Sequence, residues 1–159
     1  MNKFFKKILT KIKKLDKEVN SYKIKTNSIS MPSKAYLNWG INLALEGKIN
    51  DAIEKFEMSS NISITDPESY MNWGIALAKL HRFEEAIQKF NAALNIDRTY
   101  SSAYSLKGAA LVELNQYDEA IECYKMAIKF APYDPEIYIN WGVALARTNQ
   151  KIKAETQFR

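Results

Sequence analysis

Small and apolar side chains return along most of the chain at an interval of 34 residues. Each repeat carries one glycine, at Gly40, Gly74, Gly108 and Gly142, and an alanine twelve residues later, at Ala52, Ala86, Ala120 and Ala154. A tyrosine four residues before each glycine and a leucine three residues after it fall on one face of a helix. The alanine shares a helical face with an aromatic residue four positions further on. The pattern therefore predicts pairs of helices, and no segment alternates as a strand would.

Turn and capping residues mark the ends of these helices. Asp66 and Asp134 each precede a proline and a glutamate, which supplies an N-cap acceptor, a residue suited to the first helical position, and an acid near the positive end of the helix dipole. Short turns are expected near Gly47, at His81 and Arg82, and at 115–116. The looser block at 154–158 predicts a second helix in the fourth pair as well.

This pattern resembles the tetratricopeptide repeat, a 34-residue helix–turn–helix unit with Gly at its position 8, Ala at 20, an aromatic residue near 24 and often Pro at 32. With Ser33 as position 1, the units are 33–66, 67–100, 101–134 and an incomplete 135–159. The resemblance implies an all-α, right-handed superhelix in which glycine and alanine allow close helix approach and aromatics fill the space between hairpins. The implied function is a non-catalytic scaffold for protein–protein contact.

The resemblance also implies a binding groove, because the first helices of this family line a concave face. The positions that usually face the groove carry over to Leu37, Asn38, Ile41, Leu45, Met71, Asn72, Ile75, Lys79, Ser105, Ala109, Val112, Glu113, Ile139, Asn140, Val143 and Arg147. Most of these side chains are apolar. They suit an amphipathic helix or an extended segment with apolar anchors.

One family precedent is a clamp for a C-terminal carboxylate, which co-chaperones build from Lys, Asn and Arg. The corresponding positions of this chain hold Leu37, Ile41, Ser102 and Leu106, and only Asn72 matches. A carboxylate clamp is therefore not expected.

A second precedent is the asparagine ladder of the O-linked N-acetylglucosamine transferase array, which holds peptide backbone. Asn38, Asn72 and Asn140 match it, and Leu106 interrupts the series. These amides either hold the backbone of a bound peptide or bridge neighbouring helices.

The first twenty residues follow a different pattern. On a helical wheel at about 100° per residue, the apolar side chains share one arc and the lysines fall outside it. Residues 1–20 therefore predict a basic amphipathic helix, and residues 21–32, rich in Ser, Asn and Lys, predict a linker. The side chains expected at a membrane are Phe4, Phe5, Ile8, Leu9, Ile12, Leu15, Lys6, Lys7, Lys13 and Lys14.

Two interpretations of this helix remain open. Its apolar stripe packs on the first repeat, on another helix or in the groove of a second copy, or it adsorbs to an anionic membrane surface. A secretory signal is not expected, because lysines interrupt the apolar positions. An organellar presequence is not expected either, since the segment has no Arg and contains Asp16 and Glu18.

Charge is divided unevenly along the chain. Residues 1–34 carry ten Lys against two acids, a net charge of +8, whereas the remainder carries 13 basic and 16 acidic residues, a net charge of −3. A nucleic-acid partner is not expected, because binding to phosphates needs Lys or Arg concentrated on one face of the array. The single cysteine favours a reducing compartment, so we expect a cytoplasmic protein, free or peripheral to a membrane.

No catalytic or metal site is predicted. His81 is the only histidine and falls in a turn, while Cys123 falls on the second helix of the next repeat, so a nucleophile and its base would have to meet across different elements. Zinc needs several Cys or His ligands, and no glycine-rich phosphate loop is present. We therefore expect no metal, no other cofactor and no enzymatic activity.

The fourth unit is expected to stop within its second helix at Arg159, without the polar capping helix that terminal repeats need. We interpret this end as a truncated open reading frame, or as a surface covered by a partner, by the N-terminal helix or by self-association. The alternative function is then a substrate-recruiting region of a longer enzyme, for example a glycosyltransferase whose catalytic domain lies beyond residue 159.

Overall fold

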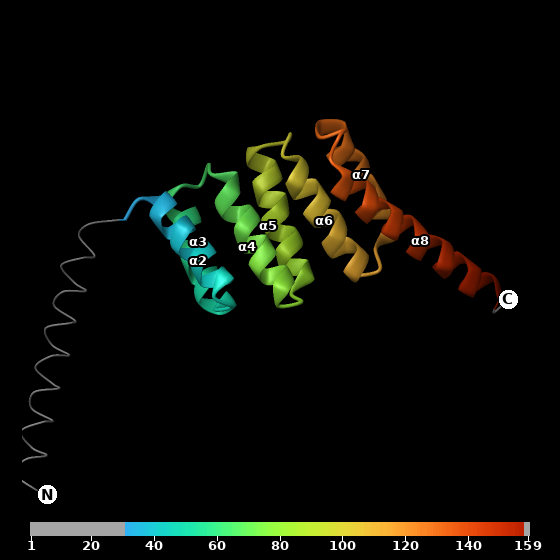
Figure 1. Ribbon diagram of the computed structural model, residues 1–159, viewed down its shortest axis with the longest axis horizontal. Helices are drawn as coiled ribbons and strands as arrows, with labels where there is room; N and C mark the ends of the chain where they lie inside the picture. Colours follow the sequence, from blue (N-terminus) through green and yellow to red (C-terminus); the bar gives the residue numbers. More distant parts are fainter. Residues whose placement is uncertain (1–30, 158–159) are drawn as a thin grey trace, which may run out of the picture. The chain divides into compact units, whose positions relative to one another are not determined.

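Seven helices follow one another in the part of the chain that the structure describes, and no strand occurs there (Figure 1). The computed structural model describes residues 31–157, with side chains up to Asn149. The helices are α2 (Ser33–Leu45), α3 (Ile49–Ile62), α4 (Pro67–Lys79), α5 (Phe83–Ile96), α6 (Ser101–Glu113), α7 (Tyr117–Phe130) and α8 (Pro135–Gln157). The predicted all-α fold is confirmed. The helix predicted over residues 1–20 lies outside the described residues.

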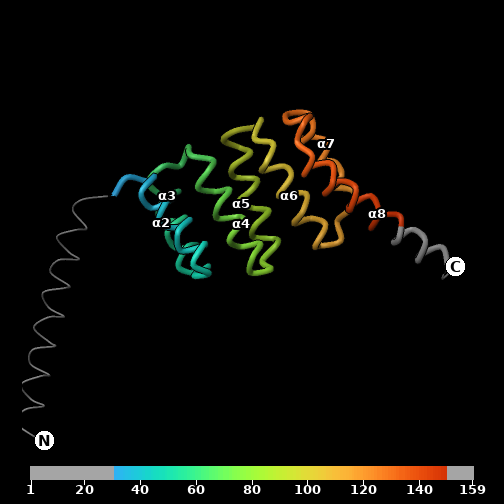
Figure 2. Tube along the Cα trace, in the orientation of Figure 1, coloured from blue at the N-terminus to red at the C-terminus, as the bar shows by residue number. Residues whose placement is uncertain are grey.

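The helices pair into hairpins that stack in a row. Helices α2 and α3, α4 and α5, and α6 and α7 form the three hairpins, and α8 packs on α7 (Figures 1 and 2). The first helices of successive units, α2, α4, α6 and α8, also contact one another in turn. Each unit therefore contacts only its neighbours, as in other repeat proteins.

The turn inside each hairpin holds one residue in the left-handed region. The φ angle is 80° at Gly47, 58° at His81 and 60° at Asn115. The backbone N–H of the following residue donates to the carbonyl of the leucine five positions earlier, at 2.9, 3.0 and 2.9 Å in the three turns. This bond satisfies a carbonyl that the helix end would leave free. The three predicted turns are confirmed.

The repeated glycine lets the two helices of a hairpin meet. A Cβ atom added to Gly40 or Gly74 would lie 2.5 Å from the Cε1 atom of Phe56 or Phe90, and one on Gly108 would lie 2.9 Å from the ring of Tyr124. The three rings are buried, each with 1% of its residue surface exposed. The predicted role is confirmed for these three glycines, and the ring that each one accommodates comes from the same hairpin.

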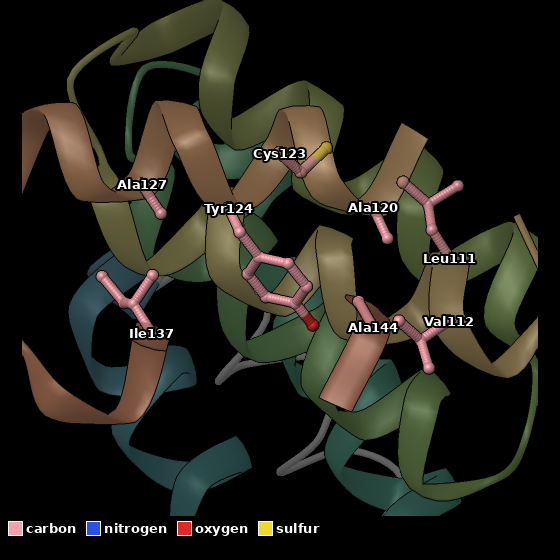
Figure 3. Close-up of a cluster of buried hydrophobic side chains, with 8 residues drawn as sticks. All are labelled: Leu111, Val112, Ala120, Cys123, Tyr124, Ala127, Ile137 and Ala144. Atoms are coloured by element: carbon pink, nitrogen blue, oxygen red, sulfur yellow. The ribbon is translucent and has the colours of Figure 1, made fainter. Parts of the chain in front are cut away.

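The largest buried cluster lies where the third hairpin meets α8. Tyr124 of α7 stands at its centre, with Leu111 and Val112 of α6 on one side and Ile137 and Ala144 of α8 close by (Figure 3). These apolar contacts fix α8 beside α6 and α7, which matters for the site described below.

The two predicted N-caps are present. An Oδ1 atom of Asp66 accepts a hydrogen bond from the Glu68 N–H at 3.1 Å, and Asp134 accepts one from the Glu136 N–H at 3.0 Å. Each bond satisfies one of the free N–H groups at the start of α4 or α8.

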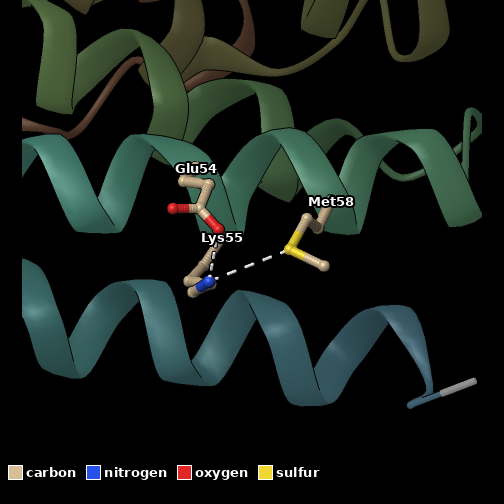
Figure 4. Close-up of polar contacts among 3 residues, drawn as sticks. All are labelled: Glu54, Lys55 and Met58. Atoms are coloured by element: carbon tan, nitrogen blue, oxygen red, sulfur yellow. Dashed lines mark hydrogen bonds and ion pairs between the residues drawn. The ribbon is translucent and has the colours of Figure 1, made fainter. Parts of the chain in front are cut away.

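Lysines of the second helices cover the tryptophans of the first two units. The Nζ atom of Lys55 lies 4.6 Å from the ring centroid of Trp39, and that of Lys89 lies 3.4 Å from the ring centroid of Trp73. Figure 4 shows the Lys55 amine beside Glu54 and Met58 on α3. Trp39 remains 45% exposed, so the lysine covers only part of its ring.

The fourth unit differs from the prediction. A second helix was expected around residues 154–158, but α8 continues as one helix of 23 residues through Asn149, the position equivalent to the three turn residues. In the first three units the second helix packs on two first helices, its own and the next. The described part of the chain contains no helix after α8. Among the described side chains, none lies within 4 Å of a Cβ added to Gly142.

No described helix, α8 included, combines the length and the apolar character that crossing a membrane would need.

Candidate peptide-binding groove

Two hollows adjoin each other along α6, and helices α4, α5 and α8 supply the rest of their lining. The first hollow, of about 280 Å³, lies over the start of α6 and is lined by Met71, Ile75, Ser102, Ser105, Leu106, Ala109, Asp134, Glu136 and Asn140. The second hollow, of about 290 Å³, lies over the end of α6 and is lined by Ile75, Ala78, Lys79, Phe83, Phe90, Leu106, Ala109, Ala110 and Glu113. Ile75, Leu106 and Ala109 line both. We call the two hollows together the groove.

The structure brings seven of the predicted site residues to the groove. These are Met71, Ile75, Lys79, Ser105, Ala109, Glu113 and Asn140. They come from α4, α6 and α8, whose order is set by the stacking of the hairpins. The middle of the predicted site is therefore assembled as one surface.

Other predicted residues lie elsewhere. Leu37 and Val112 are buried, with 2% and 5% of their surface exposed, so they belong to the core and offer no contact surface. Leu37 packs in the cluster of Phe56, and Val112 packs in the cluster that joins α6, α7 and α8. The remaining predicted residues do not line either hollow: Asn38, Ile41, Leu45, Asn72, Ile139, Val143 and Arg147.

The three asparagines do not act alike. The Asn72 Nδ2 atom donates to the Glu68 carbonyl at 2.9 Å, one turn earlier in its own helix. Asn38 is exposed on α2, and Asn140 lines the first hollow. Only Asn140 is placed where it could serve a ligand in the groove.

Sequence reasoning missed the residue at the centre of the groove. Leu106 lines both hollows, and it stood out in the sequence only as an interruption of the asparagine series. Asp134 and Glu136 also line the first hollow, although their pattern indicated only a helix start. Their second role depends on the packing of α8 beside α6, which no local pattern reveals.

Charged side chains stand at both ends of the groove. Asp134 and Glu136, from the start of α8, lie beside the start of α6. Lys79, the last residue of α4, and Glu113, the last residue of α6, lie at the other end. The Arg147 Nη1 atom lies 3.8 Å from the Glu113 Oε1 atom, so an exposed ion pair joins α8 to α6 beside the second hollow. Exposed pairs of this kind contribute little to stability.

Family models match two stretches of the chain. Residues 67–100 match the tetratricopeptide repeat, and residues 108–149 match a second model described as a TPR repeat. The chain contains tetratricopeptide repeats. The matched stretches contain α4, the end of α6 and the first part of α8, and the groove residues Ser102, Ser105 and Leu106 fall between them. No curated protein sequence is significantly similar to the chain.

Solved tetratricopeptide domains share the fold. The first TPR domain of Spaghetti (RPAP3), bound to the HSP90 peptide SRMEEVD, is 23% identical, with a TM-score of 0.73 over 76% of this chain and 95% of that one. The TPR2B domain of yeast Sti1, in complex with pHsp70, is 23% identical, with a TM-score of 0.69 over 72% and 97%. MamA from Desulfovibrio magneticus RS-1 is 27% identical, with a TM-score of 0.68 over 74% and 67%.

Outside the groove of this tetratricopeptide array, the two residues considered as a nucleophile and its base are His81 and Cys123. His81 is exposed in the turn between α4 and α5, with its ring edge-on to Phe83 at 5.6 Å. Cys123 is buried in α7, and burial raises the pKa of its thiol, which disfavours the reactive thiolate. Within the described residues, no three acidic, His or Cys side chains are placed to hold a metal ion.

Proposed function

We propose that the array is a non-catalytic binding module that holds a short segment of another protein in the groove along α6. The observation that carries the proposal is the pair of adjoining hollows with the shared apolar floor of Ile75, Leu106 and Ala109. The solved neighbours bound to HSP90 and Hsp70 peptides support it, because they show that this fold accommodates peptides.

The floor explains how such a segment would gain affinity. An apolar side chain of the partner would move out of water and into the hollow. This transfer contributes about 25 cal/mol to the binding free energy for each Å² of apolar surface that it buries. The polar side chains around the floor would fix the orientation of the segment. The fixed stacking of α4, α6 and α8 means that little ordering of the array is needed on binding.

Substitution in the first hollow tests the proposal. We expect Met71→Glu to abolish capture of the partner, because a carboxylate would be buried against the apolar anchor. The partner segment would be identified by affinity capture, and its binding to the purified variants would then be measured by calorimetry.

The control is Met126→Glu, the same change at a similarly half-buried methionine on α7 that lines neither hollow. It should bind as the wild type does. Equal binding by both variants, with helical circular dichroism intact, would move the site to another face.

Membrane association through residues 1–20 is a separate proposal that rests on the sequence pattern, because these residues lie outside the described part of the chain. A peptide of residues 1–20 should become helical on anionic vesicles and much less so on neutral ones. An equal, weak response to both vesicle types would remove the proposal.

A further inference from the structure

We infer that the groove selects an extended segment with an apolar anchor residue and positive charge beside it. This rests on the proposed function, since it names the class of partner that the same groove would take. Three features of the groove carry it: the apolar centre, the carboxylates at one end and the free polar groups of the wall.

The apolar centre lies under both hollows. Leu106 stands at the position that holds Asn38, Asn72 and Asn140 in the other units, so this unit offers an apolar surface where the others offer an amide. Ile75 and Ala109 extend this surface across α4 and α6. An apolar side chain of the partner fits here, whereas a charged one would lose its hydration.

Two carboxylates stand at the start of α6. Asp134 and Glu136 both line the first hollow, and no Lys or Arg does. Neither carboxylate forms an ion pair within residues 31–149. A Lys or Arg of the partner would meet two unpaired charges beside the apolar floor, where water is partly displaced and the attraction is stronger than in bulk solvent.

The opposite end of the groove does not repeat this arrangement. Lys79 lines the second hollow, and Glu113 there already faces Arg147 at 3.8 Å. The negative field is therefore confined to the start of α6. A bound segment would have one preferred direction, with its basic residue toward the first turn of α8.

The wall of the first hollow favours an extended backbone. Ser102, Ser105 and Asn140 line it, and their side chains make no hydrogen bond to another described residue. An extended segment has free N–H and C=O groups that these side chains can pair with, whereas a helix has already paired its own. The hydroxyls and the amide can therefore hold backbone without reading sequence.

The peptide bound to the first TPR domain of Spaghetti has the sequence SRMEEVD, with three acidic residues. The same peptide in this groove would place carboxylates near Asp134 and Glu136. Like charges at close range destabilise a complex. We therefore expect this array to discriminate against such acidic peptides.

Two labelled peptides of equal length test the inference. One is SRMEEVD, and the other is SRMKKVK, which keeps the methionine and valine and reverses the acidic positions; both are acetylated and amidated so that only side-chain charge differs. Fluorescence polarisation with the full 159-residue chain gives both dissociation constants. SRMKKVK should bind at least about tenfold more tightly, and less so at high salt because screening weakens the attraction.

Variants locate the source of the preference. Asp134→Asn combined with Glu136→Gln keeps an N-cap acceptor and removes both charges, so the preference should fall to about threefold or less. Asp118→Asn combined with Glu122→Gln removes two charges from α7, away from the groove, and should leave the preference unchanged.

Three results would overturn the inference: tighter binding of SRMEEVD, an equal loss of preference in both double variants, or no binding of SRMKKVK. If the peptides bind equally and Met71→Glu abolishes both, the charge preference is wrong while the groove remains the binding site. If they bind equally and Met71→Glu changes neither, the proposed function fails as well.

Discussion

At the scale of single residues, a missing methyl group decides how closely two helices approach. We expect Gly74→Ala to destabilise the protein by about 1–3 kcal/mol, because the new Cβ would overlap the buried Phe90 ring. Gly142→Ala should be neutral or stabilising by up to about 1 kcal/mol, because no side chain among residues 31–149 faces that position and alanine favours the helix. Urea denaturation of both variants measures the difference. A large loss at Gly142 would show that a side chain does cover it.

Burial of Tyr124 makes stability depend on alkaline pH. Desolvation raises the pKa of this phenol from 10.0 to about 12, so the folded state holds the proton more tightly than the unfolded state. Its contribution is complete below pH 10 and is lost between pH 10 and about 12, at up to about 1.4 kcal/mol per pH unit. Denaturation across this range should give a shallower decline for Tyr124→Phe. Identical declines would contradict the burial effect.

The periodic residues could be assigned from the sequence because each fills the same kind of space in each of the first three units. Glycine beneath an aromatic ring is such a case. Leu106 was not recognised, since its importance comes from breaking the series. Leu37 and Val112 were misplaced, because a position inferred from the family does not fix which way a helix is rotated against its partners.

At the scale of elements, the residue at the turn position is left-handed in the first three units and helical in the fourth. His81 has a φ of 58°, which costs a residue with a Cβ about 1 kcal/mol relative to glycine. We expect His81→Gly to be more stable than His81→Ala by about that amount. At Asn149, inside α8, the order should reverse, with Asn149→Ala more stable than Asn149→Gly. Thermal denaturation of the four variants tests this. The same order at both sites would mean that Asn149 forms a turn.

The sequence predicted α2 to α7 well because caps, turns and apolar faces agree in these helices. The fourth unit keeps the turn residue but not the turn. In the first three units the second helix packs on the first helix of its own unit and on that of the next unit. The sequence of one unit alone does not indicate whether the next first helix is there.

At the scale of the whole molecule, the stacking of the hairpins creates the groove. The groove exists because α8 lies beside α6, which brings Asp134 and Glu136 to the same hollow as Leu106. The fold and its repeat boundaries follow from a periodic pattern, whereas the charge of the groove follows from neighbours 28 to 30 residues apart in sequence. For that reason the apolar groove could be predicted and its acidic end could not.

The most direct test of the central claim is a nuclear magnetic resonance titration of the labelled protein with the partner segment identified by capture. Binding along α6 predicts that the largest shift changes cluster at Ile75, Leu106 and Ala109, with smaller changes at the start of α8. Changes confined to α3 and α7 would contradict the account.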